Sequence, residues 1–263
     1  MKKMMSLLTM VTCFGASQAK AQPPQNHHNP RLSKAAWVAM LDKGEQLANA
    51  VNSRQRLQGT QLLLRSQKLA PSEFKTLVAA SRASMLRGFA SSKPEEMVRW
   101  GKRGWAYGRE IVRRWPERAE GYYWSAIHLG LISKGSAPTT VLFNGYHTQM
   151  EKMAQIGIQK SPDSYLGIGQ RILGRYYFRL PWPMRDINKS LRYLRVAYRL
   201  APNDALAVFY YAETLWELGQ KDTAKALYRR CAKIPSNRPL AHPVQLPMRD
   251  AVQRCRKKLH DLH

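Results

Sequence analysis

Three arginines in the second half of the chain could bind an anionic group. Arg171, Arg175 and Arg179 recur every fourth residue, a spacing that stacks their side chains on one face of an α-helix. A guanidinium presents a rigid fork of N–H donors that matches a carboxylate or a phosphate. The stripe therefore predicts a binding site for a carboxylate, a phosphate or a peptide. The alternative is that these arginines only form structural ion pairs, with Glu213, Glu217 and Asp186.

No motif in the sequence indicates catalysis. The chain has no G-x-S-x-G, no H-E-x-x-H, no P-loop and no dinucleotide-binding fingerprint. Gly167 and Gly169 resemble part of such a fingerprint, but no strand-like run precedes them. The histidines lack a converging set of acid or cysteine ligands, so no metal site is expected. We therefore expect a protein that is not an enzyme and has no cofactor.

A second basic and aromatic segment precedes this region. Tryptophans and a tyrosine alternate with arginines at helical spacing, at Trp100, Trp105, Tyr107 and Trp115 beside Arg99, Arg103, Arg109 and Arg113. This pattern can grip a single-stranded nucleic acid. It also fits a helix with an aromatic core face and a snorkelling basic face.

Composition limits the class of protein. The chain has 263 residues, 43 Lys plus Arg against 17 Asp plus Glu, and a net charge of +26. Hydrophobic residues make up 44% and charged residues 23%, which excludes a wholly disordered, collagen-like or polytopic membrane protein. The charge predicts an anionic partner or surface.

The first 21 residues have the pattern of a secretory signal peptide. Lys2 and Lys3 precede a short apolar stretch, and Ala19-Lys20-Ala21 is a cleavage signal. We expect a periplasmic protein with a signal peptide at 1–21 and a flexible linker at 22–32. A lipoprotein anchored through Cys13 is the alternative, but Val11 and Thr12 fit poorly before a lipid-modified cysteine. Export argues against a nucleic-acid partner.

Removal of the signal peptide would leave two cysteines, Cys231 and Cys255. In an oxidising compartment such a pair can form a disulfide. Two buried free thiols are the alternative, and the sequence leaves both open.

The rest of the chain contains degenerate repeats. Residues 205–234 carry small residues at Ala212 and Ala224, a helix-ending Gly219, and Tyr228 and Cys231 at helical spacing. This unit resembles the 34-residue tetratricopeptide repeat, in which small residues let two helices approach closely. Weaker copies end at Pro71, Pro116, Pro162 and Pro202, and the last two of these carry Ala126 and Gly174 as their small residues.

The repeats predict an all-α protein. We expect residues 33–263 to form a right-handed solenoid of tetratricopeptide-like helix pairs with a C-terminal capping helix. The expected helices are 34–52, 54–69, 72–91, 94–115, 118–134, 143–160, 164–179, 184–200, 204–218, 221–234 and 247–261.

The tetratricopeptide resemblance also implies a binding groove. Fixed positions on the first helix of each repeat line the concave face of that fold. Mapped onto this sequence, these positions include Tyr123, Arg171, Arg175, Phe178, Arg179, Phe209, Glu213 and Trp216. Arginine and aromatic side chains are enriched at the centres of protein interfaces.

A more specific resemblance rests on Tyr122-Tyr123-Trp124 and on residues 174–204. These segments are similar to the T-component family of TRAP transporters. The resemblance implies a periplasmic scaffold that pairs with the solute-binding protein of a tripartite transporter.

We therefore expect a non-enzymatic periplasmic scaffold that binds a protein partner. One alternative is a basic envelope-associated protein that binds anionic lipid or wall polymer, and another is a small-anion carrier. The sequence leaves open whether the chain forms a homo-oligomer.

Overall fold

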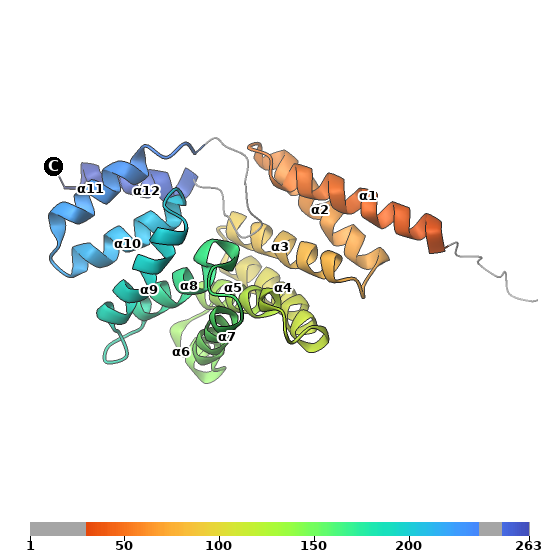
Figure 1. Cartoon of the computed structure of the whole chain (residues 1–263), viewed down its shortest axis with the longest axis horizontal. Helices are drawn as coiled ribbons and strands as arrows, with labels where there is room; N and C mark the ends of the chain where they lie inside the picture. The colour runs from red at the N-terminus through yellow and green to blue at the C-terminus, as the bar shows by residue number, and fades with distance from the viewer. Residues whose placement is uncertain (1–29, 237–248, 263) are drawn as a thin grey trace, which may run out of the picture.

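The computed structural model describes residues 30–236 and 249–262 (Figure 1). Within these ranges the secondary structure is entirely helical, with no strand. The α-helices are α1 (Pro30–Ala48), α2 (Ser53–Leu69), α3 (Phe74–Ala90), α4 (Pro94–Arg114), α5 (Ala119–Gly135), α6 (Pro138–Phe143), α7 (Tyr146–Lys160), α8 (Ile168–Arg179), α9 (Ile187–Leu200), α10 (Ala205–Glu217), α11 (Lys221–Ala232) and α12 (Arg249–His260), and a 3₁₀ helix η1 covers Ser164–Gly167.

The helices pack as successive pairs. The pairs are α1–α2, α3–α4, α5–α7, α8–α9 and α10–α11, and α12 packs on the last of them. The first pair lies at one end of the molecule and the last pair at the other (Figure 1). The prediction of an all-α solenoid of helix pairs with a closing helix is confirmed.

The small residues predicted to bring helices together lie in the core. Ala126, Ala212 and Ala224 are fully buried, and a Cβ on Gly174 would come within 2.4 Å of the Leu194 side chain. Close approach of α8 to α9 therefore depends on a residue without a side chain at position 174.

Three predicted elements differ from the structure. Helix α6 lies mostly in the gap between the helices expected at 118–134 and 143–160, and Pro138 in its first turn starts it. The helix expected at 164–179 is divided, since Tyr165, Leu166 and Gly167 all have positive φ. The first helix begins at Pro30, so residues 30–32 of the expected linker are helical, and it ends at Ala48 rather than at residue 52. The predicted signal peptide, with Cys13, lies outside the described residues.

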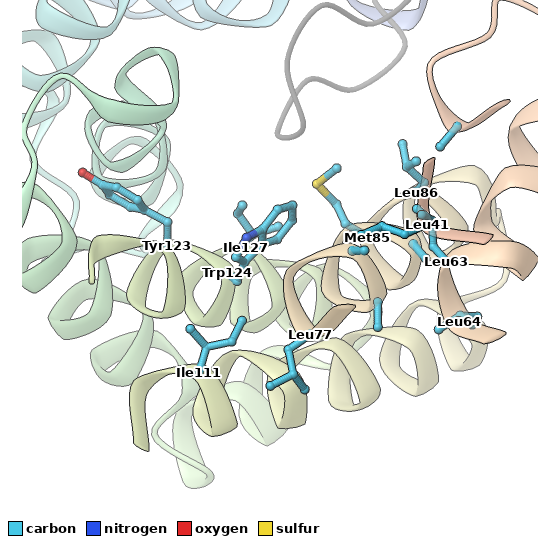
Figure 2. Packing of buried hydrophobic residues seen from close by; sticks show 14 of the residues in the cluster. Leu41, Leu63, Leu64, Leu77, Met85, Leu86, Ile111, Tyr123, Trp124 and Ile127 are labelled. Atoms are coloured by element: carbon cyan, nitrogen blue, oxygen red, sulfur yellow. The ribbon is translucent and has the colours of Figure 1, made fainter. Parts of the chain in front are cut away.

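The largest core cluster contains residues of all five helices from α1 through α5, with contributions from η1 and α8. Its members include Leu63 of α2, Leu77 of α3, Ile111 of α4 and Trp124 of α5 (Figure 2). A second cluster joins α10, α11 and α12. None of the described helices combines the length and apolar character needed to cross a bilayer.

A disulfide connects the closing helix to the solenoid. Cys231 of α11 is bonded to Cys255 of α12, and both lie in the apolar cluster with Ala251 and Val252. The link therefore holds α12 over the last helix pair.

Replacing both cysteines with alanine should destabilise the protein. The bond spans 24 residues of sequence, and the chain-entropy model gives about 3.5 kcal/mol of unfolding free energy for a loop of that size. Denaturant unfolding of the oxidised protein and of the Cys231→Ala/Cys255→Ala variant measures the difference. Equal stabilities would show that the bond does not hold α12 in place.

Candidate binding surface

The predicted arginine stripe divides into buried and accessible positions along α8. Arg171 is buried, and its Nη1 donates to Asp204 Oδ2 at 2.8 Å. The other oxygen of Asp204 accepts the backbone N–H groups of Leu206 and Ala207 and so caps α10. Arg171 therefore fixes α8 to the start of α10 and is not available to a ligand.

One turn further along, Arg175 is half-buried between two aromatic rings. Its guanidinium lies 4.9 Å from the Phe178 ring centre and 4.4 Å from that of Tyr210. Its Nη1 also donates to Glu213 Oε2 at 2.7 Å. Arg175 thus joins α8 to α10 through the ion pair with Glu213 and the contact with the Tyr210 ring, while the Phe178 contact lies within α8.

A third cation extends this arrangement from the loop after α8. The Arg185 guanidinium lies 5.0 Å from the Phe178 ring centre, and its Nη2 is 3.1 Å from Glu217 Oε2. Its Nε donates to the backbone oxygen of Phe178 at 3.1 Å. Alternating arginine, aromatic and acidic side chains thus form one continuous set of contacts.

We call this set the α8–α10 surface. With the neighbouring exposed Arg179 and half-buried Trp216, it comprises Arg175, Phe178, Arg179, Arg185, Tyr210, Glu213, Trp216 and Glu217.

Two residues predicted to line the groove are buried instead. Tyr123 is fully buried because α5 is packed by α3, α4, α7 and α8, and its hydroxyl donates to the backbone oxygen of Ser161. Phe209 is also buried, 6.0 Å from the Tyr228 ring. Tyr123, Phe209 and Arg171 are therefore part of the core, and the expectation that they face a ligand is corrected.

Sequence reasoning missed Tyr210 and Arg185. The groove positions of the repeat include Phe209, which is next to Tyr210 in the sequence, but not Tyr210 itself. Arg185 lies in the irregular loop at 181–186, where no helical spacing indicates a position. Asp186, which also lies in that loop, was expected to pair with the arginine stripe. It instead caps α9, and its Oδ2 lies 3.8 Å from Lys189 Nζ. Of the expected pairings, that of Arg175 with Glu213 is present, whereas Glu217 pairs with Arg185 instead of one of the three predicted arginines.

Tyr228 of the second core cluster lies within electrostatic reach of Glu213 and Glu217 of the α8–α10 surface. Burial, with the charges of Glu213 and Glu217, raises the pKa of Tyr228. Tyr228 therefore stays a neutral phenol at physiological pH.

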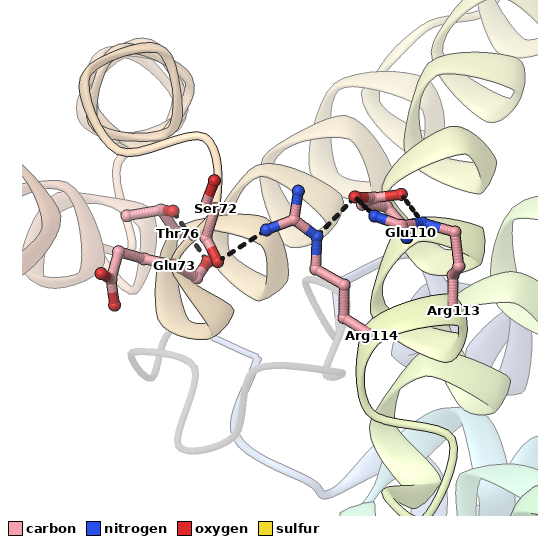
Figure 3. A network of polar contacts seen from close by, with 6 residues as sticks. All are labelled: Ser72, Glu73, Thr76, Glu110, Arg113 and Arg114. Carbon is pink, nitrogen blue, oxygen red and sulfur yellow. Dashed lines mark hydrogen bonds and ion pairs between the residues drawn. The ribbon is translucent and has the colours of Figure 1, made fainter.

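A cleft lies near the N-terminal helices. This cleft of about 680 Å³ is lined by residues of α1, the α2–α3 turn and Arg118. The turn is held by Arg114, which donates to the backbone oxygen of Ser72 at 3.2 Å and pairs with Glu110 (Figure 3). Hydrogen bonds from Arg113 and Arg114 lower the pKa of Glu110 to about 2. This network ties α4 to the rim of the cleft.

One serine–histidine contact resembles part of a catalytic group. Ser81 Oγ lies 2.9 Å from His128 Nε2, but both side chains are fully buried. Burial lowers the pKa of His128 to about 3, so the imidazole is neutral. The pair is a core contact between α3 and α5.

Within the described ranges, no three His, Cys, Asp or Glu side chains gather closely enough to hold a metal ion.

Comparison with known proteins places the fold. No protein-family model matches the chain, and no curated protein matches it. A solved structure that is similar is TTC0263, a thermophilic TPR protein from Thermus thermophilus, with a TM-score of 0.61 and 17% sequence identity over 84% of this chain and 100% of that chain. The fold is that of a TPR protein. At this identity the likeness concerns the fold alone.

Proposed function

We propose that this protein is a non-enzymatic periplasmic scaffold that binds a protein partner through the α8–α10 surface. The partner that the sequence resemblance favours is the solute-binding protein of a TRAP-type transporter. One observation carries the proposal, which is the partly exposed ion pair Arg175–Glu213 between the Phe178 and Tyr210 rings.

The charge pairing favours a protein over a small anion. Arg171 and Arg175 are both neutralised by carboxylates, so a free anion would have to displace Asp204 or Glu213. A protein surface can instead use both charge signs together with the ring faces. Tyrosine, tryptophan and arginine are the residues most often found as hot spots in such interfaces.

Exposed apolar side chains border this surface. Trp182 is 88% exposed and Met184 is 43% exposed, both in the loop that carries Arg185. The backbone N–H of Asp186 donates to the carbonyl of Tyr177 at 3.1 Å, which holds this loop against the end of α8. An exposed tryptophan beside a charged and aromatic surface is typical of an interaction site.

Export is supported by two features. Residues 1–21 have the pattern of a signal peptide. The disulfide between Cys231 and Cys255 fits an oxidising compartment.

An affinity pull-down at low salt tests the proposal, with the chain lacking residues 1–21 as bait. The variant Trp182→Ala/Arg185→Glu changes the exposed loop, and Arg195→Glu/Val196→Ala makes the same kinds of change on exposed positions of α9. We expect the loop variant to recover about tenfold less of one envelope protein, and the α9 variant to match the wild type within about twofold. Equal recovery with both variants, or no partner with the wild type, would contradict the proposal.

A further inference from the structure

A cluster of three arginines surrounds one tryptophan on a different part of the molecule. The guanidinium carbons of Arg87, Arg99 and Arg103 lie 4.9, 5.6 and 5.4 Å from the ring centre of Trp100. Arg87 comes from α3, and the other three residues come from α4. Three positive charges are thus held around a single indole.

Two of these guanidinium groups are fixed in orientation through Nε. Arg87 Nε donates to Thr60 Oγ1 of α2 at 2.9 Å. Arg103 Nε donates to the Tyr107 hydroxyl at 3.2 Å, and that hydroxyl donates to Gln67 Oε1 at 3.4 Å. Because these bonds use Nε, the terminal N–H groups of both arginines stay available to another acceptor.

The cluster is short of negative charge. Glu96 pairs with Arg99 at 2.8 Å, but no carboxylate in the described part of the chain pairs with Arg87 or Arg103. The pKa of Arg87 is lowered by burial and by the charges of Arg103 and Arg99. This contrasts with the α8–α10 surface, where Arg175 and Arg185 each have a carboxylate partner.

We propose that Arg87, Arg99 and Arg103 around Trp100 form a binding site for a phosphate group. A phosphate carries several acceptor oxygens and can accept hydrogen bonds from two or three guanidinium groups at once. Its charge would also offset the repulsion among the arginines. The neighbouring α2 carries four cations and no acid, so it adds to the positive potential of this part of the molecule.

The phosphate could belong to a phospholipid head group or to a soluble phosphate ester, and the shared chemistry is the same. The site is built from α2, α3 and α4, and so does not depend on the partner proposed for the α8–α10 surface. Failure of one proposal therefore leaves the other standing.

Two measurements on the full chain test the site and separate the two sources. Calorimetry with glycerol 1-phosphate reports a soluble ester. Co-sedimentation with phosphatidylcholine vesicles, with and without phosphatidylglycerol, reports a head group. The test variant is Arg87→Gln/Arg103→Gln, and the control is Arg192→Gln/Arg195→Gln, which removes the same charge from exposed positions on α9.

We expect the test variant to lose about tenfold in affinity for at least one probe, and the control to lose less than about twofold. The phosphate-bearing probe that binds the wild type identifies the source. The melting temperature without ligand checks folding, and binding should raise it for the wild type and the control but not for the test variant. Equal losses in the two variants would mean that diffuse charge is responsible and would overturn the site, as would no binding to either probe at low salt.

Discussion

Replacing Gly104 with alanine is expected to lower the free energy of unfolding by about 3 kcal/mol. A Cβ at this position would lie 2.0 Å from Cε1 of the His128 ring, which is fully buried between α4 and α5. Gly101 and Gly108 lie on the same face of α4, against Ile132 and Ser125, so the helices cannot separate locally without losing these contacts too. The destabilisation should appear directly in urea unfolding.

Gly130→Ala is the matched control. Gly130 lies on α5, and a Cβ there would meet only the Met150 sulfur, at 3.3 Å. Because that side chain is flexible and alanine favours the helix, the change should alter stability by less than about 1 kcal/mol. A similar loss in both variants would contradict the close approach of α4 to α5.

His128 should make the protein less stable as the pH falls. Its pKa in the folded protein is about 3, against an ordinary value of 6.5, so only the unfolded chain takes up a proton between these values. Unfolding therefore becomes more favourable as the pH falls through this window. The expected loss between pH 7 and pH 5 is about 2 kcal/mol.

The variant His128→Gln isolates this effect. Glutamine keeps a hydrogen-bonding group near Ser81 and does not titrate, so the slope of stability against pH should flatten between pH 7 and pH 5. The raised pKa of Glu45, caused by burial, acts in the opposite direction just above pH 4.5, but both proteins contain that residue. Chemical unfolding at several pH values gives the two slopes. Identical slopes would mean that His128 is not buried as a neutral ring.

The helical architecture could be predicted because small residues recur where helices must meet. Ala212, Ala224 and Gly174 were identified from their positions in the tetratricopeptide-like repeats, and each is buried or closely packed against a neighbouring helix. Local signals also placed most helix ends within a few residues, since a proline or a capping residue starts α4, α9 and α10.

The binding residues were harder to predict because an ideal repeat does not specify what its neighbours cover. Tyr123 occupies a groove position of the repeat, but four helices pack around α5 and bury it. Arg171 follows the same spacing as Arg175, yet the cap of α10 places Asp204 next to it. Arg185 lies in a loop without periodicity, so its contact with Phe178 depends on tertiary structure.

Site-specific photo-cross-linking tests the partner surface most directly. A photoreactive residue replaces Arg179 beside the α8–α10 surface in one variant, and exposed Arg195 on α9 in another. We predict that, in cells, the residue at position 179 forms a covalent adduct with one envelope protein and that the residue at position 195 does not. Adducts with the same protein from both positions, or from position 195 alone, would contradict binding through this surface.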